Sequence, residues 1–455
     1  MSIAVTRHPA ARLCVLLLIF LLALAPVCPA YSVLTHEEIV DLLWQQQIVP
    51  LLKARFPNAT DQDLQKAHAY AYGGSVIQDI GYYPFGNELF SDLAHYVRSG
   101  DFVQALIRDS QDLNEYAFAL GALAHYCSDT HGHPYVNLSV GILYPELSRQ
   151  YGPAVPYDVD HKAHLATEFG FDVLQVAKGR YASEDYHNFI GFEVATPVLE
   201  RAFQDTYGLP LKSVMPNEQL AINTYRRSIS QIIPETTKIA LLVKGDQLRQ
   251  EIPNFNRQRF LYHLSKADYR KSWGGEYKQP GPGTRVLAVL VKVLPKVGPL
   301  RAVNFKEPTA KTEDLYFRSV DQTVSAYGEA LHQVKTGNLD APEIDLDTGK
   351  PTARGEYPLA DITYRELLDK LAAAKFANVT PELRDSIVNF YRDFELQSLP
   401  AGVQKCILER RSQTYKELTQ LRALNLSPPA ARLQPLSPGQ QVALIVPQPS
   451  SSSER

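Results

Sequence analysis

The sequence predicts an all-α protein. Apolar runs of helical length follow one another along the chain, separated by Gly, Pro and Asp, whereas patterns typical of strands are nearly absent. Helix start signals agree with this, since Thr380 precedes Pro381 and Glu382, a hydroxyl cap followed by a proline at the first helical position. The 455 residues, 45% of them apolar, are enough to bury a substantial core.

The apolar pattern places the helices in order along the chain. Predicted helices cover residues 37–55, 61–72, 102–108, 114–128, 161–178, 186–206, 218–247, 257–272, 312–336, 364–375, 381–396 and 403–424. Gly132 and Pro134 are expected to end the helix that contains 114–128. The longest stretches without a helical pattern are 273–284 and 337–358, and the second is interpreted as a lid or a linker.

The first thirty residues are typical of a secretory signal peptide. Arg7 and Arg12 precede an apolar run from Leu13 to Ala25, and the small Ala30 suits the position before a signal-peptidase cut. The run is shorter than the ~20 residues that span a bilayer. We therefore predict cleavage after Ala30, a mature chain that begins at Tyr31, and export to the periplasm or the extracellular space.

The remaining chain is predicted to contain a helical catalytic domain at 31–210, a helical extension at 211–424 and a disordered Pro- and Ser-rich tail at 425–455. The formal charge of −3 and the absence of polybasic segments exclude a dedicated duplex-DNA binder held by phosphate neutralisation. A nuclease that uses metal chemistry is still compatible with this charge. The extension has only two histidines, His263 and His332, and is assigned no chemistry.

The cysteines predict little cross-linking. Cys14 and Cys28 leave with the signal peptide, and the bulky Val27 disfavours lipoprotein processing at Cys28. Only Cys127 and Cys406 could pair after export. Because Cys127 lies in an apolar helical stretch, a buried free thiol is the favoured interpretation.

Histidines and carboxylates are concentrated in a few short segments. In LGALAHYCSDTHGHP, His125 and Asp129 stand four residues apart on an apolar helix, so both project from one face into the interior. A buried carboxylate needs a partner, and an imidazole beside it favours a metal ion. The chain turning away after Asp129 is expected to offer one more imidazole, for which His133 is favoured over His131.

The segment DHKAHLATEFGFDVL repeats this spacing. His164 and Glu168 are one helical turn apart and can hold one metal ion together, whereas His161, one turn earlier, is the less favoured ligand. Asp79 in GGSVIQDIGYYP lies beside glycines that permit close backbone approach. Alone, each motif is more often an exposed pair, a loop aspartate or, for His95, a half-buried helix histidine. Together they favour a metal site.

The ordered ligand set resembles the zinc-dependent phospholipase C family, a superfamily that also contains secreted single-strand nucleases and the catalytic domain of glycosylphosphatidylinositol-specific phospholipase D. The resemblance covers roughly residues 31–178 and is best in 117–133 and 164–174. Some relatives have Trp in place of Tyr31 and often Pro in place of Gln78, but neither difference removes a ligand. The residues that carry the resemblance are His36, Asp79, His95, His125, Asp129, His133, His164 and Glu168.

The resemblance implies an α-helical fold with three clustered Zn²⁺ ions. Its first implied zinc ligands are Asp79, His95, His125 and Asp129. Its second set is His133, His164 and Glu168. Its third set is the amino and carbonyl groups of Tyr31, with His36 and Asp129. Asp129 is therefore expected to bridge metal ions.

The expected function is that of an exported zinc-dependent phosphodiester hydrolase similar to phospholipase C. A zinc-bound hydroxide would attack the phosphodiester, with Asp79 as general base or water-orienting carboxylate. Phospholipid is the first substrate class, with peripheral contact to a membrane surface, and no stable nucleic-acid complex is expected. The alternatives are a single-strand nuclease or nucleotidase, and a non-catalytic zinc-stabilised helical scaffold or binding protein.

Two further segments could contact substrate. Residues 285–301 have apolar runs with cationic edges that suit a lipid interface, although a buried core helix is favoured. Tyr82, Tyr83 and Phe85 follow Asp79 and could line an acyl-chain entrance or a base-stacking shelf, or simply pack in the core.

Overall fold

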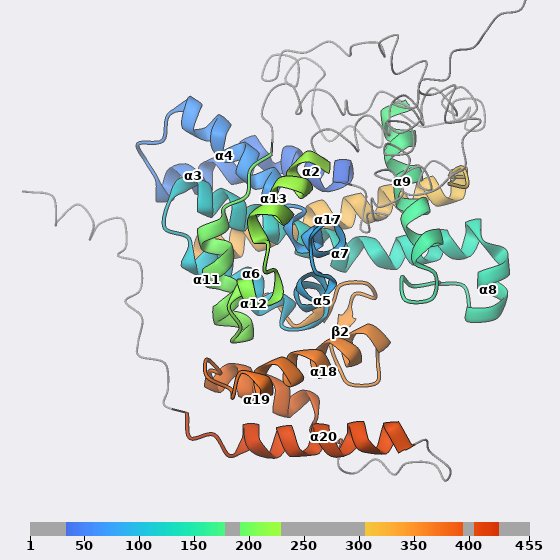
Figure 1. Ribbon diagram of the computed structural model, residues 1–455. Coiled ribbons are helices and arrows are strands. Elements are labelled where there is room, and N and C mark those ends of the chain that lie inside the picture. The colour runs from blue at the N-terminus through green and yellow to red at the C-terminus, as the bar shows by residue number, and fades with distance from the viewer. Residues whose placement is uncertain (1–32, 178–191, 229–304, 395–404, 427–455) are drawn as a thin grey trace, which may run out of the picture.

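The computed structural model describes residues 33–177, 192–228, 305–394 and 405–426, which are coloured in Figure 1. These residues are predominantly helical, which confirms the all-α prediction. The signal peptide, Tyr31, residues 285–301 and the tail from 427 onward lie outside the described residues. Within the described ranges, no helix combines the length and the apolar character needed to cross a membrane.

The elements follow in chain order, and the two strands form a short antiparallel hairpin. They are α2 (Val33–Leu43), a π-helical turn (Trp44–Ile48), α3 (Val49–Arg55), α4 (Asp61–Gly74), a 3-10 helix (Ile77–Tyr82), α5 (Glu88–Tyr96), α6 (Ser99–Asp109), α7 (Leu113–Leu143), α8 (Pro145–Tyr151), α9 (His161–Ala177), α11 (Thr196–Tyr207), α12 (Leu211–Val214), α13 (Glu218–Arg227), α17 (Ala310–Thr336), β1 (Ile344–Asp345), β2 (Lys350–Pro351), α18 (Pro358–Ala373), α19 (Pro381–Phe390) and α20 (Lys405–Arg422).

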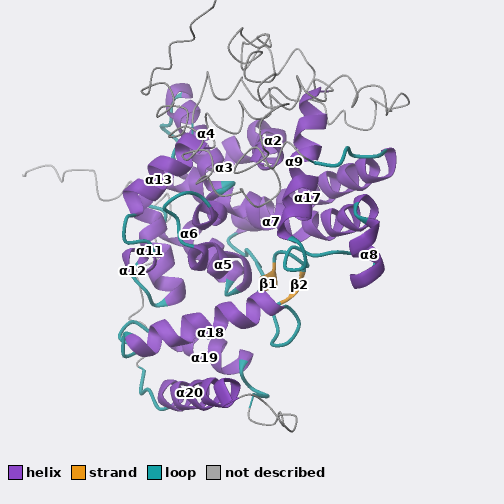
Figure 2. Ribbon diagram, turned by 45° about the vertical axis from the view of Figure 1, so that its right-hand side comes forward, coloured by secondary structure: helices purple, strands orange, loops and turns teal. Residues whose placement is uncertain are grey.

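Helix α7 is the central element of the fold (Figures 1 and 2). It is capped by Asp112, whose side chain accepts a hydrogen bond from the Glu115 N–H, and it is apolar nearly all round as far as Cys127. A helix with this pattern must be covered on every side. Helices α2, α4, α6, α9 and α17 all contact it.

The prediction that Gly132 and Pro134 end this helix is wrong, because α7 continues to Leu143. Proline removes only one helical hydrogen bond, the bond to the carbonyl four residues earlier, which here is that of Thr130. The turn at Gly349 lies against this carbonyl, and a Cβ built on Gly349 would be 2.6 Å from the Thr130 oxygen. His133 therefore stays on the helix, one turn beyond Asp129.

Several other helix predictions need correction. The sequence analysis missed α5, which begins after the cap residue Asn87 and spans only nine residues, too few for a clear apolar period. Residues 192–195 are not helical and α11 begins at Thr196, so the predicted helix 186–206 is wrong at 192–195, while its first residues, 186–191, lie outside the described residues. Helix α18 begins at Pro358 rather than 364, and α19 ends at Phe390 rather than 396.

The stretch 337–358, predicted as a lid or a linker, contains the hairpin β1–β2 and is fastened to the N-terminal half. Ser99 Oγ donates to the Ile344 carbonyl at 2.6 Å, and Tyr126 OH donates to the Pro342 carbonyl at 2.6 Å. Gly100 permits a close approach, since a Cβ there would lie 1.9 Å from the Ala341 oxygen. The hairpin is thus part of the packed structure.

Buried apolar side chains form one cluster that includes Phe118 of α7, Tyr327 of α17 and Leu367 of α18. Tyr327 OH donates to the Leu120 carbonyl at 2.9 Å, which fixes α17 along α7. Cys127 is a buried free thiol, as predicted, and burial raises its pKa to about 12. The domain boundaries predicted after residues 210 and 424 stay a prediction.

Gly121→Ala is expected to destabilise the fold, because α4 and α7 touch through glycines. A Cβ on Gly121 would lie 2.0 Å from the Ala71 carbonyl oxygen, a backbone atom that cannot move alone. We expect a loss of about 1–3 kcal/mol, measured by urea unfolding. Gly328→Ala on α17 is the matched control, since its Cβ would meet only the flexible Gln47 side chain at 3.0 Å. Equal stabilities of the two variants would contradict this account of the α4–α7 contact.

Glu343→Gln is expected to flatten the pH dependence of stability. Burial and the nearby Asp101 raise the pKa of Glu343 from 4.5 to about 8. Between these values the folded state keeps the proton and the unfolded state loses it, so stability falls by up to about 1.4 kcal/mol per pH unit as pH rises. Glutamine cannot titrate, yet it can still accept the Asp101 N–H bond of 3.0 Å.

The measurement is urea unfolding of wild type and variant from pH 5 to pH 8. The exposed Glu382→Gln on α19 serves as the control and should reproduce the wild-type profile. If the stability of Glu343→Gln and of wild type changed with pH in the same way, the Glu343 carboxyl would not contribute to the pH dependence of stability.

Candidate metal centre

Eight of the predicted ligands lie together in the interior, and all are buried. His36 comes from α2, Asp79 from the 3-10 helix and His95 from α5. The remaining five come from two helices: His125, Asp129 and His133 from α7, and His164 and Glu168 from α9. The ninth predicted ligand, Tyr31, lies outside the described residues.

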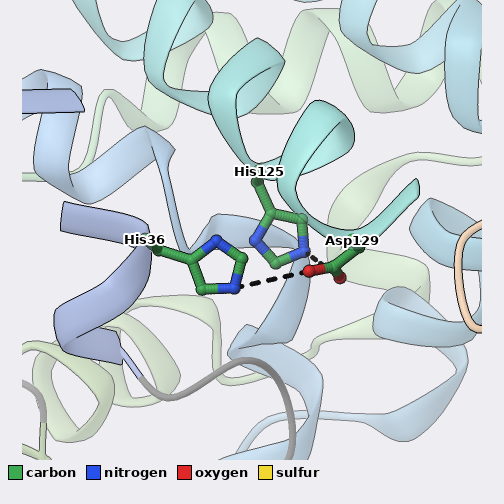
Figure 3. Close-up of side chains that lie close together, drawn as sticks. All are labelled: His36, His125 and Asp129. Carbon is green, nitrogen blue, oxygen red and sulfur yellow. Dashed lines mark ion pairs between the residues drawn. The ribbon is translucent and has the colours of Figure 1, made fainter. Parts of the chain in front are cut away.

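Asp129 is the centre of this arrangement. Its Oδ1 lies 3.4 Å from His36 Nε2 and 3.7 Å from His133 Nε2. Its Oδ2 lies 3.0 Å from His125 Nε2 and 3.3 Å from His95 Nε2. Figure 3 shows the imidazoles of His36 and His125 directed at this carboxylate from two different helices. Each oxygen thus faces two imidazoles.

Three groups of side chains have potential ligand atoms within 4.8 Å of one another. These groups are His36 with His125 and Asp129, Asp79 with His95 and His125, and His133 with His164 and Glu168. In the third group Glu168 Oε1 lies 3.0 Å from His164 Nε2 and 3.4 Å from His133 Nε2. This spacing is compatible with ligand bonds of about 2.0–2.2 Å from a central zinc ion.

Backbone carbonyls fix the orientation of three of the imidazoles. The Nδ1 atom of His95 lies 2.7 Å from the Ser91 oxygen, and that of His125 lies 2.9 Å from the Ser75 oxygen. His133 Nδ1 lies 3.1 Å from the Leu346 oxygen. Since a carbonyl can only accept, Nδ1 carries a proton in each ring, and in the neutral form each ring would present its Nε2 lone pair to the centre.

This arrangement fits a metal ion. The Nε2 atoms of His95 and His125 are 3.4 Å apart, and two lone pairs at that distance repel unless a cation lies near them. Within the described residues, neither Asp129 oxygen accepts a hydrogen bond of normal geometry, although the residue is 0% exposed. Buried carboxylates and neutral imidazoles with their lone pairs directed inward are typical zinc ligands.

The pKa values of the ligands shift in both directions. Burial alone would lower the pKa of His95 and His133, but neighbouring carboxylates outweigh burial and raise it well above its usual value, so metal binding at these two rings would displace a proton. Burial alone would raise the pKa of Asp129, but the neighbouring His125 and His133 outweigh burial and lower the pKa well below its usual range. Burial and the nearby His125 lower the pKa of His36 well below its usual value. An ionised carboxylate and a neutral imidazole are the forms that bind metal.

Comparison with known proteins is consistent with this site. Residues 35–217 match the family model described as zinc dependent phospholipase C. This segment belongs to the zinc-dependent phospholipase C family. The comparisons with curated proteins and with solved structures found no match. The matched segment of this phospholipase C family contains all eight described candidate ligands.

The structure distinguishes the histidines between which the sequence left a choice. His164 is buried beside Glu168, whereas His161 is exposed and stacks on Tyr157 at 4.0 Å between ring centroids. His133 is in the third group, whereas His131 is only partly buried and belongs to none of the three groups found in the described chain. Metal binding by the buried histidines stays a prediction.

The aromatic residues after Asp79 have different environments. Tyr83 is buried against Tyr225, with 4.8 Å between ring centroids, as the core-packing interpretation expects. Tyr82 is half-buried, 5.9 Å from the His95 ring, and its hydroxyl donates to Asp92. Phe85 is 61% exposed, and its φ of 65° is in the left-handed region.

Sequence reasoning missed Asp347, which the hairpin brings to the edge of the centre. Its Oδ1 lies 3.3 Å from His133 Nδ1. It belongs to the segment IDLDTGK, and the only signal there is a pair of acids beside apolar residues and a turn glycine. Its distance along the chain from the family segment concealed its place in the fold.

His164→Ala is expected to lower the zinc content of the purified protein, because it removes one imidazole from a group of three buried ligands. His161→Ala, one helical turn away on the exposed side of α9, should retain the wild-type content. Elemental analysis of both variants after dialysis against a weak chelator makes the comparison. Equal zinc in the two variants would exclude His164 as a ligand.

Proposed function

We propose that this chain is an exported zinc-dependent phosphodiester hydrolase that acts on phospholipids in the manner of a phospholipase C. The observation that carries the proposal is the position of Asp129 among four imidazoles, inside the segment that matches the family model. A buried carboxylate that faces converging lone pairs is the arrangement from which a multinuclear zinc site is made.

The proposed centre would hold three zinc ions, with Asp129 shared between ligand sets. The proposed ligands are Tyr31, His36, Asp79, His95, His125, Asp129, His133, His164 and Glu168. When bound, zinc supplies Lewis acidity toward a phosphoryl oxygen and lowers the pKa of coordinated water toward neutrality. The surrounding side chains keep the ligands in place and exclude bulk water, since all eight described ligands are buried.

Asp79 is proposed to accept the proton of the attacking water or to orient that water. Its Oδ1 lies 3.4 Å from His95 Nε2, and the backbone around it is a tight 3-10 helix rather than a mobile loop. A carboxylate fixed in this way keeps its oxygen at one place relative to the substrate phosphate. General-base assistance of this kind contributes typically about 10²–10⁴-fold to a rate.

Catalysis is favoured over a purely structural role by the size of the ligand groups. Structural zinc sites are usually closed by four protein ligands, whereas catalytic sites leave a position for water. The group of His133, His164 and Glu168 has three members among the described residues. A zinc ion held by these three would have room for water or for a phosphate oxygen.

Export would complete the centre. The proposed cleavage after Ala30 releases an amino group at Tyr31, only two residues before α2 begins at Val33. His36, on that same helix, is directed at Asp129 (Figure 3). The new N-terminus is therefore close in sequence to the centre and is proposed to ligate there.

Peripheral contact with a membrane surface is part of the proposal. Phe85 exposes 61% of its surface only six residues after Asp79. An exposed aromatic side chain close in sequence to a proposed ligand suits the interfacial region of a bilayer, where apolar rings and polar head groups meet.

The test uses the mature chain from Tyr31, loaded with zinc, on phosphatidylcholine vesicles and on single-stranded DNA. We expect cleavage of the lipid that stops when a chelator removes zinc. Asp79→Asn should lower kcat about 10²–10⁴-fold while zinc content is retained.

His161→Ala is the control variant and should be fully active. Cleavage of DNA alone would assign the chain to the nuclease branch of the superfamily. Zinc binding without turnover on either substrate would leave a zinc-stabilised scaffold, and full activity of Asp79→Asn would exclude the role proposed for that carboxylate.

A further inference from the structure

The hairpin β1–β2 brings a carboxylate to the metal centre from outside the family segment. Asp347 lies in the turn between the two strands, far beyond residue 217 where the family match ends, and is 3% exposed. Figure 2 shows the orange strands between the helical body around α7 and the layer of α18–α20. The strand β1 contacts α5 and α6.

Two acceptors from this hairpin meet one nitrogen of His133. Nδ1 lies 3.1 Å from the Leu346 carbonyl oxygen and 3.3 Å from Asp347 Oδ1. The opposite nitrogen, Nε2, lies 3.4 Å from Glu168 Oε1 on the metal side. With two acceptors at Nδ1, a proton is held there, and Nε2 is the nitrogen that a metal ion between His133 and Glu168 would bind.

Asp347 is itself held at several atoms. Its Oδ2 accepts hydrogen bonds from Tyr96 OH at 2.8 Å and from Tyr357 OH at 2.6 Å. Its carbonyl accepts from Asn137 Nδ2 at 2.8 Å, one turn beyond His133 on α7. These contacts satisfy Oδ2 and direct Oδ1 at the imidazole.

The same hairpin also ties together two ligand-bearing helices. The Leu346 N–H donates to the carbonyl of His95 on α5 at 3.2 Å. The turn at Gly349, with a φ of 70°, fits against the Thr130 carbonyl of α7. A shift of the hairpin would therefore move the Asp347 carboxylate, α5 and α7 relative to one another.

We propose that Asp347 is a positioning residue for His133, which holds its imidazole in the tautomer and direction that present Nε2 to the metal. The proposal rests on the proposed metal centre. The nitrogens of His95 and His125 are fixed by Ser91 and Ser75, which belong to the family segment. His133 is fixed instead by the hairpin, so the C-terminal part of the chain completes the centre.

Carboxylates that accept from the second nitrogen of a metal-bound histidine raise its basicity and fix its orientation. Loss of such a partner typically costs about 10- to 100-fold in metal affinity or activity. A merely structural aspartate at this place would affect folding stability but not the release of one particular zinc ion. The two roles therefore differ in a measurable way.

The test is Asp347→Asn in the full chain. Asparagine has nearly the same shape, but its amide group can donate to Nδ1 and so favours the tautomer with the proton on Nε2, which cannot bind metal. We expect about 10- to 100-fold weaker zinc affinity at one site in a chelator competition assay. The visible spectrum of the cobalt-substituted protein should change as well.

Two further variants separate positioning from folding. Lys350→Ala alters an exposed residue of the same hairpin and should keep wild-type zinc affinity. Tyr357→Phe removes one hydrogen bond from Asp347 without removing the charge, so it should weaken zinc binding in the same direction but less. If Asp347→Asn fails to fold, the Tyr357→Phe measurement decides the question.

Zinc affinity and cobalt spectrum equal to wild type in a folded Asp347→Asn, or in Tyr357→Phe when that variant decides, would overturn the positioning role. A wild-type chain that binds no zinc would reject the metal centre itself, which is a different failure. Weaker binding at one site, with Lys350→Ala unaffected, supports the proposal.

Discussion

The arrangement of helices around the candidate metal centre depends on the burial of one carboxylate, that of Asp129. Asp129 is 0% exposed at the middle of the central helix, and an uncompensated charge there would be unfavourable by several kcal/mol. Four imidazoles on α2, α5 and α7 face this carboxylate, and they can compensate its charge either as protonated rings or through a cation that they share with it. Since these helices are separate in sequence, the folded state must bring three elements to one point, and the helices that cover α7 hold them there.

The path of α7 makes this convergence possible. His125, Asp129 and His133 lie on successive turns of one helix, so their side chains share a face only if the helix is unbroken. Pro134 would be expected to break it, but α7 continues to Leu143 and the Gly349 turn lies against the Thr130 carbonyl that has lost its helical partner. The hairpin therefore supports the helix geometry and also orients His133.

The sequence predicts the parts of the site that depend on local spacing. Pairs four residues apart on a helix, such as His125 with Asp129 and His164 with Glu168, face the same way whatever the rest of the fold does. Asp347 could not be found in this manner, because its contact with His133 joins residues more than two hundred positions apart. Helix α5 was missed because its nine residues are too few to show the apolar period of a helix, although its His95 was identified as a candidate ligand.

The general rule that a proline ends a helix failed for a similar reason. The rule describes the local cost of proline, the loss of one helical hydrogen bond, and the packing of α7 among α2, α4, α6, α9 and α17 keeps the helix continuous. Long-range contacts of this kind leave no periodic trace in the sequence, so they are visible only in the folded structure.

The dependence of the centre on the hairpin bears on how the two halves of the chain are related. An imidazole that ligates a metal must be held by its other nitrogen, and for His133 that contact comes from Leu346 and Asp347. Tyr357 OH, which donates to Asp347, also accepts from the Asp158 N–H just before α9. One short polar chain thus runs from α9 through the hairpin to α7. The segment that matches the family model contains all eight described candidate ligands, but the hydrogen-bond network around them extends into the part of the chain beyond it.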